Sequence, residues 1–256
     1  MPRFFEQCPK CEHAPLPDEQ ALPVACPSCG VILGKVAAIA SSEHEVSTLE
    51  SSEPIESFWA RVRALMFHVP ENVSPPSLYG RAVLLTIFAL WGAKLILLDY
   101  RTGEINASFL HGPLLVFHEA GHVVFRILGD FMMVFGGTLA QLLLPAIIAT
   151  AFLVRNRDPF GAAMGTWLLG VSVLDVAPYV YDALDPQLIL LGGQTGEEGG
   201  HDWIYLLDQL GVTHGAHALG WFAHKVGAVI VLGSIAWAAY LLLSQRKRLI
   251  SAGARE

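Results

Sequence analysis

The stretch F-H-E-A-G-H-V at residues 117–123 holds two histidines four positions apart, His118 and His122. On an α-helix, positions i and i+4 lie on one face a turn apart, so the two imidazoles can share a metal ion. Glu119 lies about 100° further round the helix, where its carboxylate can take a proton from a water that the metal activates. The spacing predicts a zinc site with His118 and His122 as ligands and Glu119 as general base.

The residues around this motif are apolar from 113 to 128. An ionisable side chain at the centre of a membrane helix costs about 2.5–3.5 kcal/mol on insertion scales. Three such residues within five positions are tolerated there when a metal and a polar pocket compensate. The alternative is a pair of histidines hydrogen-bonded to neighbouring helices, with the glutamate bridging them.

In this setting the motif resembles the site-2 protease family of intramembrane zinc metalloproteases. That family adds an aspartate ligand from a later helix, in a motif of the type N-x2-P-x4-D-G. Here residues 175–183 read D-V-A-P-Y-V-Y-D-A, so Asp175 replaces the asparagine, Pro178 matches and Asp182 takes the place of the ligand. The spacing is one residue shorter, and alanine replaces the final glycine. The resemblance implies a third zinc ligand at Asp182 and hydrolysis of a peptide bond in or near the membrane.

Other third ligands remain open. Asp175 ends an apolar run, and a carboxylate in that position needs a partner. The H-D-W stretch at residues 201–203 follows a glycine-rich loop that can fold back over the site. The spacing of Glu198 and Asp202 also resembles the E-x3-D pair of CAAX-processing membrane metalloproteases. The alternatives to Asp182 are therefore Asp175, His201, Asp202 and Glu198.

All four cysteines of the chain lie in two C-P-x-C motifs near the N-terminus. Two thiolates from each of two tight turns complete a tetrahedral site, and the spacing is that of a zinc ribbon. The ligands of this structural zinc would be Cys8, Cys11, Cys26 and Cys29. Iron suits the same four thiolates, and free or disulfide-bonded cysteines are the other reading. With the histidine motif, the sequence predicts one catalytic and one structural zinc.

The composition places the rest of the chain in a membrane. Of the 256 residues, 53% are hydrophobic and 15% charged, whereas soluble proteins have about 25% charged residues. Residues 1–56 hold nine acidic and three basic residues, so the acidity of the chain belongs to its N-terminal part. This distribution excludes a disordered chain and a basic nucleic-acid-binding protein.

Five apolar stretches approach the length of about 20 residues that crosses a bilayer. They are residues 82–98, 113–128, 131–154, 160–174 and 226–243. A short amphipathic helix is expected at residues 203–210. The fold class is therefore mainly α, a polytopic helical membrane bundle of about five to six segments with a small N-terminal zinc ribbon.

The expected domains are a zinc ribbon (1–36), an acidic flexible linker (37–57), an interfacial segment (58–80) and a membrane-embedded metalloprotease-like bundle (81–256). The first seven residues lack the apolar core of a signal peptide, and the C-terminal Arg246, Lys247 and Arg248 favour a cytoplasmic position. Five full spans cannot place both ends of the chain in the cytoplasm. One segment is then half-length, with residues 131–137 as the candidate, or one end lies outside.

The sequence favours an intramembrane zinc metalloprotease. It is expected in the bacterial cytoplasmic membrane, with the zinc ribbon in the cytoplasm. Its expected partners are a membrane-protein or membrane-proximal peptide substrate, the lipid bilayer, and a protein that binds the zinc ribbon; no nucleic acid is expected. The alternative is a non-proteolytic zinc-binding membrane protein that senses or handles metal, or a scaffold that recruits a partner through its ribbon.

Overall fold

The computed structural model describes residues 5–18, 24–36, 57–70 and 73–253. The chain divides into two compact units, residues 1–61 and 62–256. The described part of the first unit holds the four cysteines and a small core that includes Leu16 and Leu33. Apart from Ser57, the expected linker at 37–57 lies outside the described residues.

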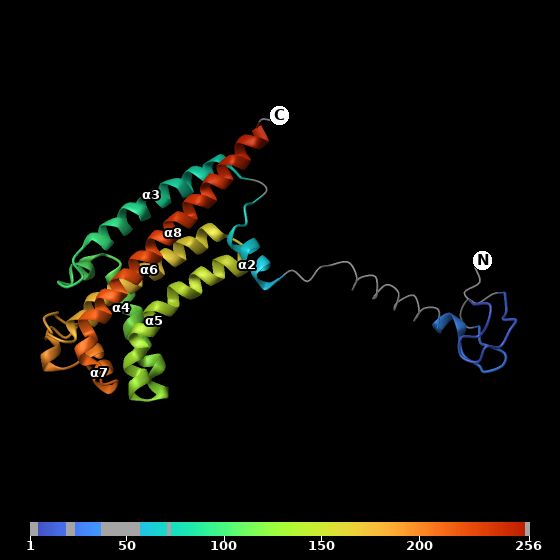
Figure 1. The fold of residues 1–256 in the computed structure, drawn as a ribbon, viewed down its shortest axis with the longest axis horizontal. Helices are drawn as coiled ribbons and strands as arrows, with labels where there is room; N and C mark the ends of the chain where they lie inside the picture. The colour runs from blue at the N-terminus through green and yellow to red at the C-terminus, as the bar shows by residue number, and fades with distance from the viewer. Residues whose placement is uncertain (1–4, 19–23, 37–56, 71–72, 254–256) are drawn as a thin grey trace. The chain divides into compact units, whose positions relative to one another are not determined.

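The second unit is built from helices (Figure 1). Its α-helices are α3 (Pro75–Leu97), α4 (His111–Phe125), α5 (Asp130–Thr150), α6 (Pro159–Asp182), α7 (Asp202–Gln209) and α8 (Ala216–Gly253), and α2 (Phe58–Met66) crosses the boundary between the two units. A π-helical turn at Ala151–Arg155 continues α5. The mainly helical fold with an N-terminal four-cysteine cluster is confirmed.

Four of these helices are long and apolar enough to cross a membrane. They are α3, α5 with its π-helical turn, α6, and α8 with the turn that precedes it. The expected segment at 113–128 differs, because it forms the 15-residue α4, shorter than the about 20 residues that a span needs. The half-length segment is thus the one that carries the histidines, whereas residues 131–137 belong to the continuous helix α5.

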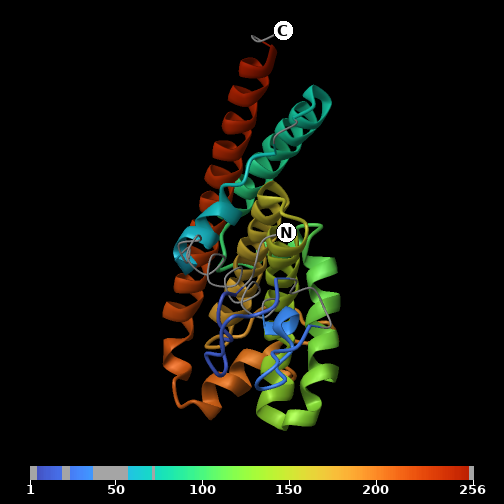
Figure 2. The same ribbon diagram turned by 90° about the vertical axis from the view of Figure 1, so that its right-hand side faces the viewer.

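Two apolar clusters hold α3, α6 and α8 together. Near one end, Leu78 of α3, Phe160 of α6 and Leu241 of α8 share a buried cluster. Further along, Leu95 of α3, Trp167 of α6 and Val231 of α8 belong to a second cluster. Figures 1 and 2 both show α3 and α8 running side by side. This packing makes α6 the central helix, on which site residues can be held rigidly.

Helices α4 and α5 approach closely because glycines face each other. A Cβ atom on Gly121 would clash with the carbonyl oxygen of Gly136, and a Cβ on Gly136 would lie 2.6 Å from Cβ of Phe125. Small residues at such crossings let two backbones touch. The contact brings the histidine-bearing face of α4 against the first half of α5.

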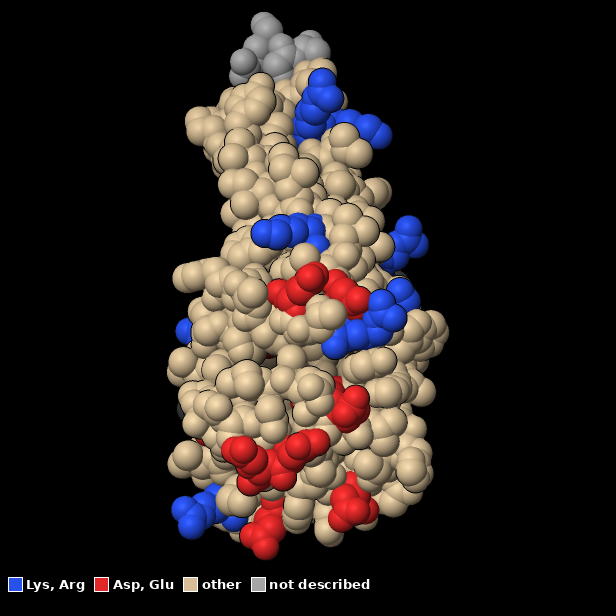
Figure 3. All heavy atoms as spheres, turned by 90° about the vertical axis from the view of Figure 1, so that its left-hand side faces the viewer, with Lys and Arg blue, Asp and Glu red and all other residues tan. Residues whose placement is uncertain are grey.

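The two ends of the bundle differ in charge. Arg248 near the end of α8 donates to the carbonyl oxygen of Val69 at 2.8 Å, and Arg81 of α3 pairs with Asp158 at 3.3 Å. The opposite end carries α7 and the acidic loop before it. In Figure 3 uncharged surface covers much of the visible face, and basic side chains lie near the C-terminus, in the middle and at the lower end, while the carboxylates lie in the middle and lower parts.

Candidate metal centres

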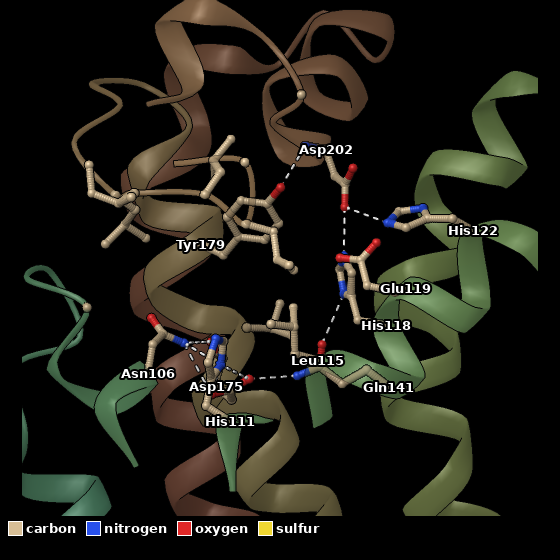
Figure 4. Close-up of a pocket in the computed structure, with 18 of the residues that line it drawn as sticks. Asn106, His111, Leu115, His118, Glu119, His122, Gln141, Asp175, Tyr179 and Asp202 are labelled. Carbon is tan, nitrogen blue, oxygen red and sulfur yellow. Dashed lines mark hydrogen bonds and ion pairs between the residues drawn. The ribbon is translucent and has the colours of Figure 1, made fainter. Parts of the chain in front are cut away.

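The two histidines of α4 converge, as their spacing predicts. His118 and His122 have ring centroids 4.9 Å apart, and ligand atoms of His118, Glu119 and His122 all lie within 4.8 Å of one another (Figure 4). His118 is buried, at 5% exposure. These three residues form a candidate metal site.

Hydrogen bonds orient both imidazoles through their Nδ1 atoms. His122 Nδ1 lies 2.9 Å from the carbonyl oxygen of Met133, and His118 Nδ1 lies 3.1 Å from Oε1 of Gln141. Both partners are acceptors, so each Nδ1 carries a hydrogen. The neutral ring then has its free lone pair on Nε2, and this tautomer can bind a metal through Nε2.

The orientation of Gln141 follows from a buried carboxylate. Gln141 Nε2 donates to Oδ2 of Asp175 at 2.8 Å. With the amide nitrogen on Asp175, the amide oxygen of Gln141 faces Nδ1 of His118. Asp175 on α6 therefore sets the tautomer of His118 through Gln141 on α5.

Asp202, at the start of α7, supplies the carboxylate next to both histidines. Its Oδ2 lies 2.8 Å from Nε2 of His118 and 3.3 Å from Nε2 of His122. Burial alone would raise the pKa of the Asp202 carboxyl, but its hydrogen bonds with the two histidines outweigh burial and hold this pKa below its ordinary value. This carboxylate is placed where it can serve as a metal ligand.

The donor set fits a metal ion. Two Nε2 lone pairs and one carboxylate oxygen converge, and three acceptors this close need a cation between them, either protons on the rings or a metal. In a tetrahedral zinc site with bonds of about 2.0–2.1 Å, neighbouring ligand atoms lie about 3.3–3.4 Å apart. The 3.3 Å separation of Asp202 and His122 fits this value, and the 2.8 Å separation from His118 requires a shift of about half an ångström.

A glycine of α5 leaves room beside the two Nε2 atoms. A Cβ atom on Gly137 would lie 2.7 Å from Nε2 of His118 and 2.7 Å from Nε2 of His122. Any larger residue would push into the space between the imidazoles. The small side of α5 therefore forms a wall of the candidate site.

Glu119 faces an open cavity of about 690 Å³. The cavity is lined by His118, His122 and Asp202 at the candidate site, and by Tyr179 and residues of the loop at 188–194. Glu119 is exposed toward it, whereas His118 is buried. A carboxylate in this position can exchange protons with a molecule bound in the cavity.

Asp182, which the resemblance implies as third ligand, lies against His201 instead. Its Oδ2 is 3.3 Å from Nε2 of His201, and its Oδ1 accepts from the backbone amides of Gln187 and Leu188 at 2.7 and 3.1 Å. His201 in turn caps α7, since its Nδ1 accepts from the Ile204 amide at 3.3 Å. Asp182 therefore lies beside the residue that caps the helix presenting Asp202.

Asp175 likewise has partners of its own. Its Oδ1 lies 3.0 Å from Nδ1 of His111 and accepts from Asn106 at 3.1 Å, in addition to the bond from Gln141. At 5% exposure, this carboxylate is buried and satisfied by three side chains. Glu198, the remaining alternative, lies in a short 3-10 turn before α7.

The four cysteines form the second candidate site. Their sulfur atoms all lie within 4.8 Å of one another, with Cys8 Sγ 3.6 Å from Cys29 Sγ and Cys11 Sγ 3.8 Å from Cys26 Sγ. A tetrahedron with Zn–S bonds of about 2.3 Å has an edge of about 3.8 Å. The sulfur arrangement fits a tetrathiolate metal site.

The sequence singles out Gln141 as a polar contact and Gly136 and Gly137 as a place of close backbone approach, but it does not give their roles as the link to Asp175 and as the wall beside the imidazoles. It also gives no role to Tyr179, whose hydroxyl accepts from the Asp202 amide. A glutamine inside an otherwise apolar span was a usable signal, since a buried amide needs polar partners. No sequence pattern marks Tyr179.

Comparison of this chain with protein-family models, curated proteins and solved structures gave no match. The resemblance to site-2 proteases therefore rests on the motif and its surroundings.

Proposed function

We propose that this chain is a membrane zinc metallopeptidase that hydrolyses a peptide bond in or near the bilayer. The observation that carries the proposal is the convergence of His118, His122 and Asp202 beside Glu119, at a cavity of about 690 Å³. Three protein ligands with an open position are typical of catalytic zinc, whereas structural zinc has four.

In this proposal His118, His122 and Asp202 hold the zinc. A zinc ion in this site supplies Lewis acidity, which polarises the scissile carbonyl and makes a water molecule more acidic. Glu119 takes a proton from the attacking water and returns it to the leaving nitrogen. Met133, Gln141 and Asp175 keep the imidazoles in the tautomer that binds metal.

The assignment of Asp202 replaces that of Asp182 as third ligand. It is supported by the two short distances from Asp202 to the histidines and by the separate engagement of Asp182 with His201. The tetracysteine cluster is proposed to hold a structural zinc that folds the first unit.

The test begins with membrane vesicles from cells that produce either the wild-type chain or the Glu119→Gln variant. New amino termini of membrane proteins are labelled and quantified by mass spectrometry. The proposal expects termini that depend on Glu119, with zinc content unchanged in the variant. Equal sets of termini from both proteins would favour the non-proteolytic alternative, a membrane protein that handles or senses metal.

A further inference from the structure

Tyr179 on α6 lies at the edge of the candidate site. Its ring stacks at a tilt on His201, with centroids 4.2 Å apart, and lies edge-on to His118 at 6.1 Å. Its hydroxyl oxygen accepts a hydrogen bond from the backbone amide of Asp202 at 2.9 Å. In Figure 4 this hydroxyl is turned toward Asp202, on the side of the cavity where Glu119 and the histidines lie.

The direction of this hydrogen bond leaves the phenolic hydrogen available. An amide can only donate, so the Asp202 N–H uses a lone pair of the Tyr179 oxygen and not its hydrogen. Within the described part of the chain, this amide is the hydrogen-bond partner of the hydroxyl. The O–H hydrogen can therefore point into the cavity that Tyr179 lines together with Glu119 and His122.

Hydrolysis of a peptide bond creates negative charge on the carbonyl oxygen. As the water oxygen bonds to the carbonyl carbon, the π electrons move onto the carbonyl oxygen, and they return when the C–N bond breaks. A fixed donor near that oxygen stabilises the transition state more than the ground state. The amide of Asp202 holds the Tyr179 hydroxyl in place, so little reorganisation is needed during the reaction.

We propose that Tyr179 is a further catalytic residue, which donates its hydroxyl hydrogen to the developing oxyanion of the scissile carbonyl. The hydrogen stays on Tyr179 throughout, and Glu119 alone carries the proton from water to the leaving nitrogen. This inference rests on the proposed peptidase function and adds a second electrophilic group to the site.

The test compares Tyr179→Phe with Tyr181→Phe in the purified full-length chain. Tyr181 is the matched control, because its ring stacks on His217 at 4.0 Å and lies edge-on to Tyr100, outside the cavity lining. The probe is a fluorogenic peptide built from a cleavage site that depends on Glu119. With zinc in excess, Tyr179→Phe should keep its zinc and its KM while kcat falls about 10²–10³-fold, and Tyr181→Phe should keep its kcat.

A second readout separates catalysis from a structural role. A phosphinate analogue of the same peptide carries a negative oxygen where the oxyanion forms. Tyr179→Phe should weaken binding of this analogue by the same factor as kcat/KM. In the Glu119→Gln background, the added Tyr179→Phe change should leave binding of the uncleaved peptide unchanged.

Unchanged kcat in Tyr179→Phe, or loss of its zinc, would overturn the assignment of Tyr179 and leave the peptidase proposal standing. Absence of any cleavage that depends on Glu119 in the wild-type chain would overturn the peptidase proposal, and the assignment of Tyr179 with it.

Discussion

At the residue scale, chemistry depends on how single side chains are oriented. His118 and His122 offer their Nε2 atoms because their Nδ1 atoms donate to Gln141 and Met133. Asp202, the proposed third ligand, comes from a helix that begins 84 residues after His118. A metal site of this kind fails when any of these orientations is lost.

Replacing Asp202 with alanine should remove the metal from the histidine site and leave the cysteine site loaded. Zinc per purified chain, measured by plasma emission spectrometry, should fall from two to one. The same loss is expected for His118→Ala with His122→Ala. Asp182→Asn is the comparison, since Asp182 lies against His201, and it should keep most of the metal. Full zinc content in Asp202→Ala would exclude Asp202 as a ligand.

Replacing Gly137 with alanine should also abolish metal binding at the histidine site. The added Cβ would lie 2.7 Å from both Nε2 atoms, so the imidazoles must move apart. Gly80→Ala on α3 is the control, because a Cβ there has nothing within 4 Å. Zinc content and helix content by circular dichroism should both match wild type in Gly80→Ala, whereas Gly137→Ala should lose zinc alone. Retained zinc in Gly137→Ala would show that the site can accommodate a Cβ atom at position 137.

The bond from Asp175 to Gln141 predicts an effect at a distance. Asp175→Asn should weaken zinc binding about 10–100-fold, because the amide of Gln141 is then free to turn and no longer fixes the tautomer of His118. Competition with a zinc chelator measures the change. Equal affinity in Asp175→Asn and wild type would mean that Gln141 keeps its orientation without the carboxylate.

At the element scale, the eight-residue helix α7 positions the proposed third ligand of the histidine site. It presents Asp202 from its first turn, and it is held by His201 at its N-cap and by the hydroxyl of Tyr179. His201 is itself held by Asp182 at the end of α6. The end of one long helix thus fixes the start of a short one.

Replacing His201 with alanine should loosen α7 without removing a metal ligand. Loss of an N-cap costs about 0.5–2 kcal/mol of helix stability, so we expect zinc affinity to fall several-fold rather than disappear. Hydrogen exchange of amides at 203–209 should become faster, while exchange in α6 stays the same. Unchanged exchange in α7 would show that the His201 cap does not hold the helix.

At the scale of the whole molecule, four long apolar helices can each cross the membrane, whereas α4 is too short to do so. One apolar cluster joins the N-terminal ends of α3 and α6 to the C-terminal half of α8, so these three parts lie at the same end of the bundle. With four candidate spans, the chain enters and leaves the membrane on that same side. Figures 1 and 2 place α7 and the turn between α4 and α5 at the opposite end from the C-terminus. The basic residues at the C-terminus favour the cytoplasm for that end.

This arrangement predicts that residues 197 and 251 face opposite sides of the membrane. In a background with all four native cysteines replaced by serine, Glu197→Cys and Ser251→Cys are each tested with a membrane-impermeant maleimide. Glu197→Cys should be labelled from the outside of intact cells, and Ser251→Cys only after the membrane is opened. Labelling of both from one side would rule out the four-span arrangement.

The sequence by itself determined what depends on short spacing. The i, i+4 histidines, the two C-P-x-C motifs and the apolar stretches each involve neighbours along the chain, whose geometry follows from helix and turn periodicity. The clustering of the four cysteines and that of His118, Glu119 and His122 could therefore be predicted before any fold was known, as could the helical class.

Only the tertiary structure decided which distant groups meet these residues. Asp182, Asp175 and Asp202 are all plausible ligands by type, and a few residues of helix or loop length decide which of them reaches the histidines. The contacts of His118 with Gln141 and Asp202 join residues 23 and 84 positions apart, and the packing of α4, α5, α6 and α7 sets them. Local periodicity carries no information on such contacts, because they depend on how whole helices pack against one another.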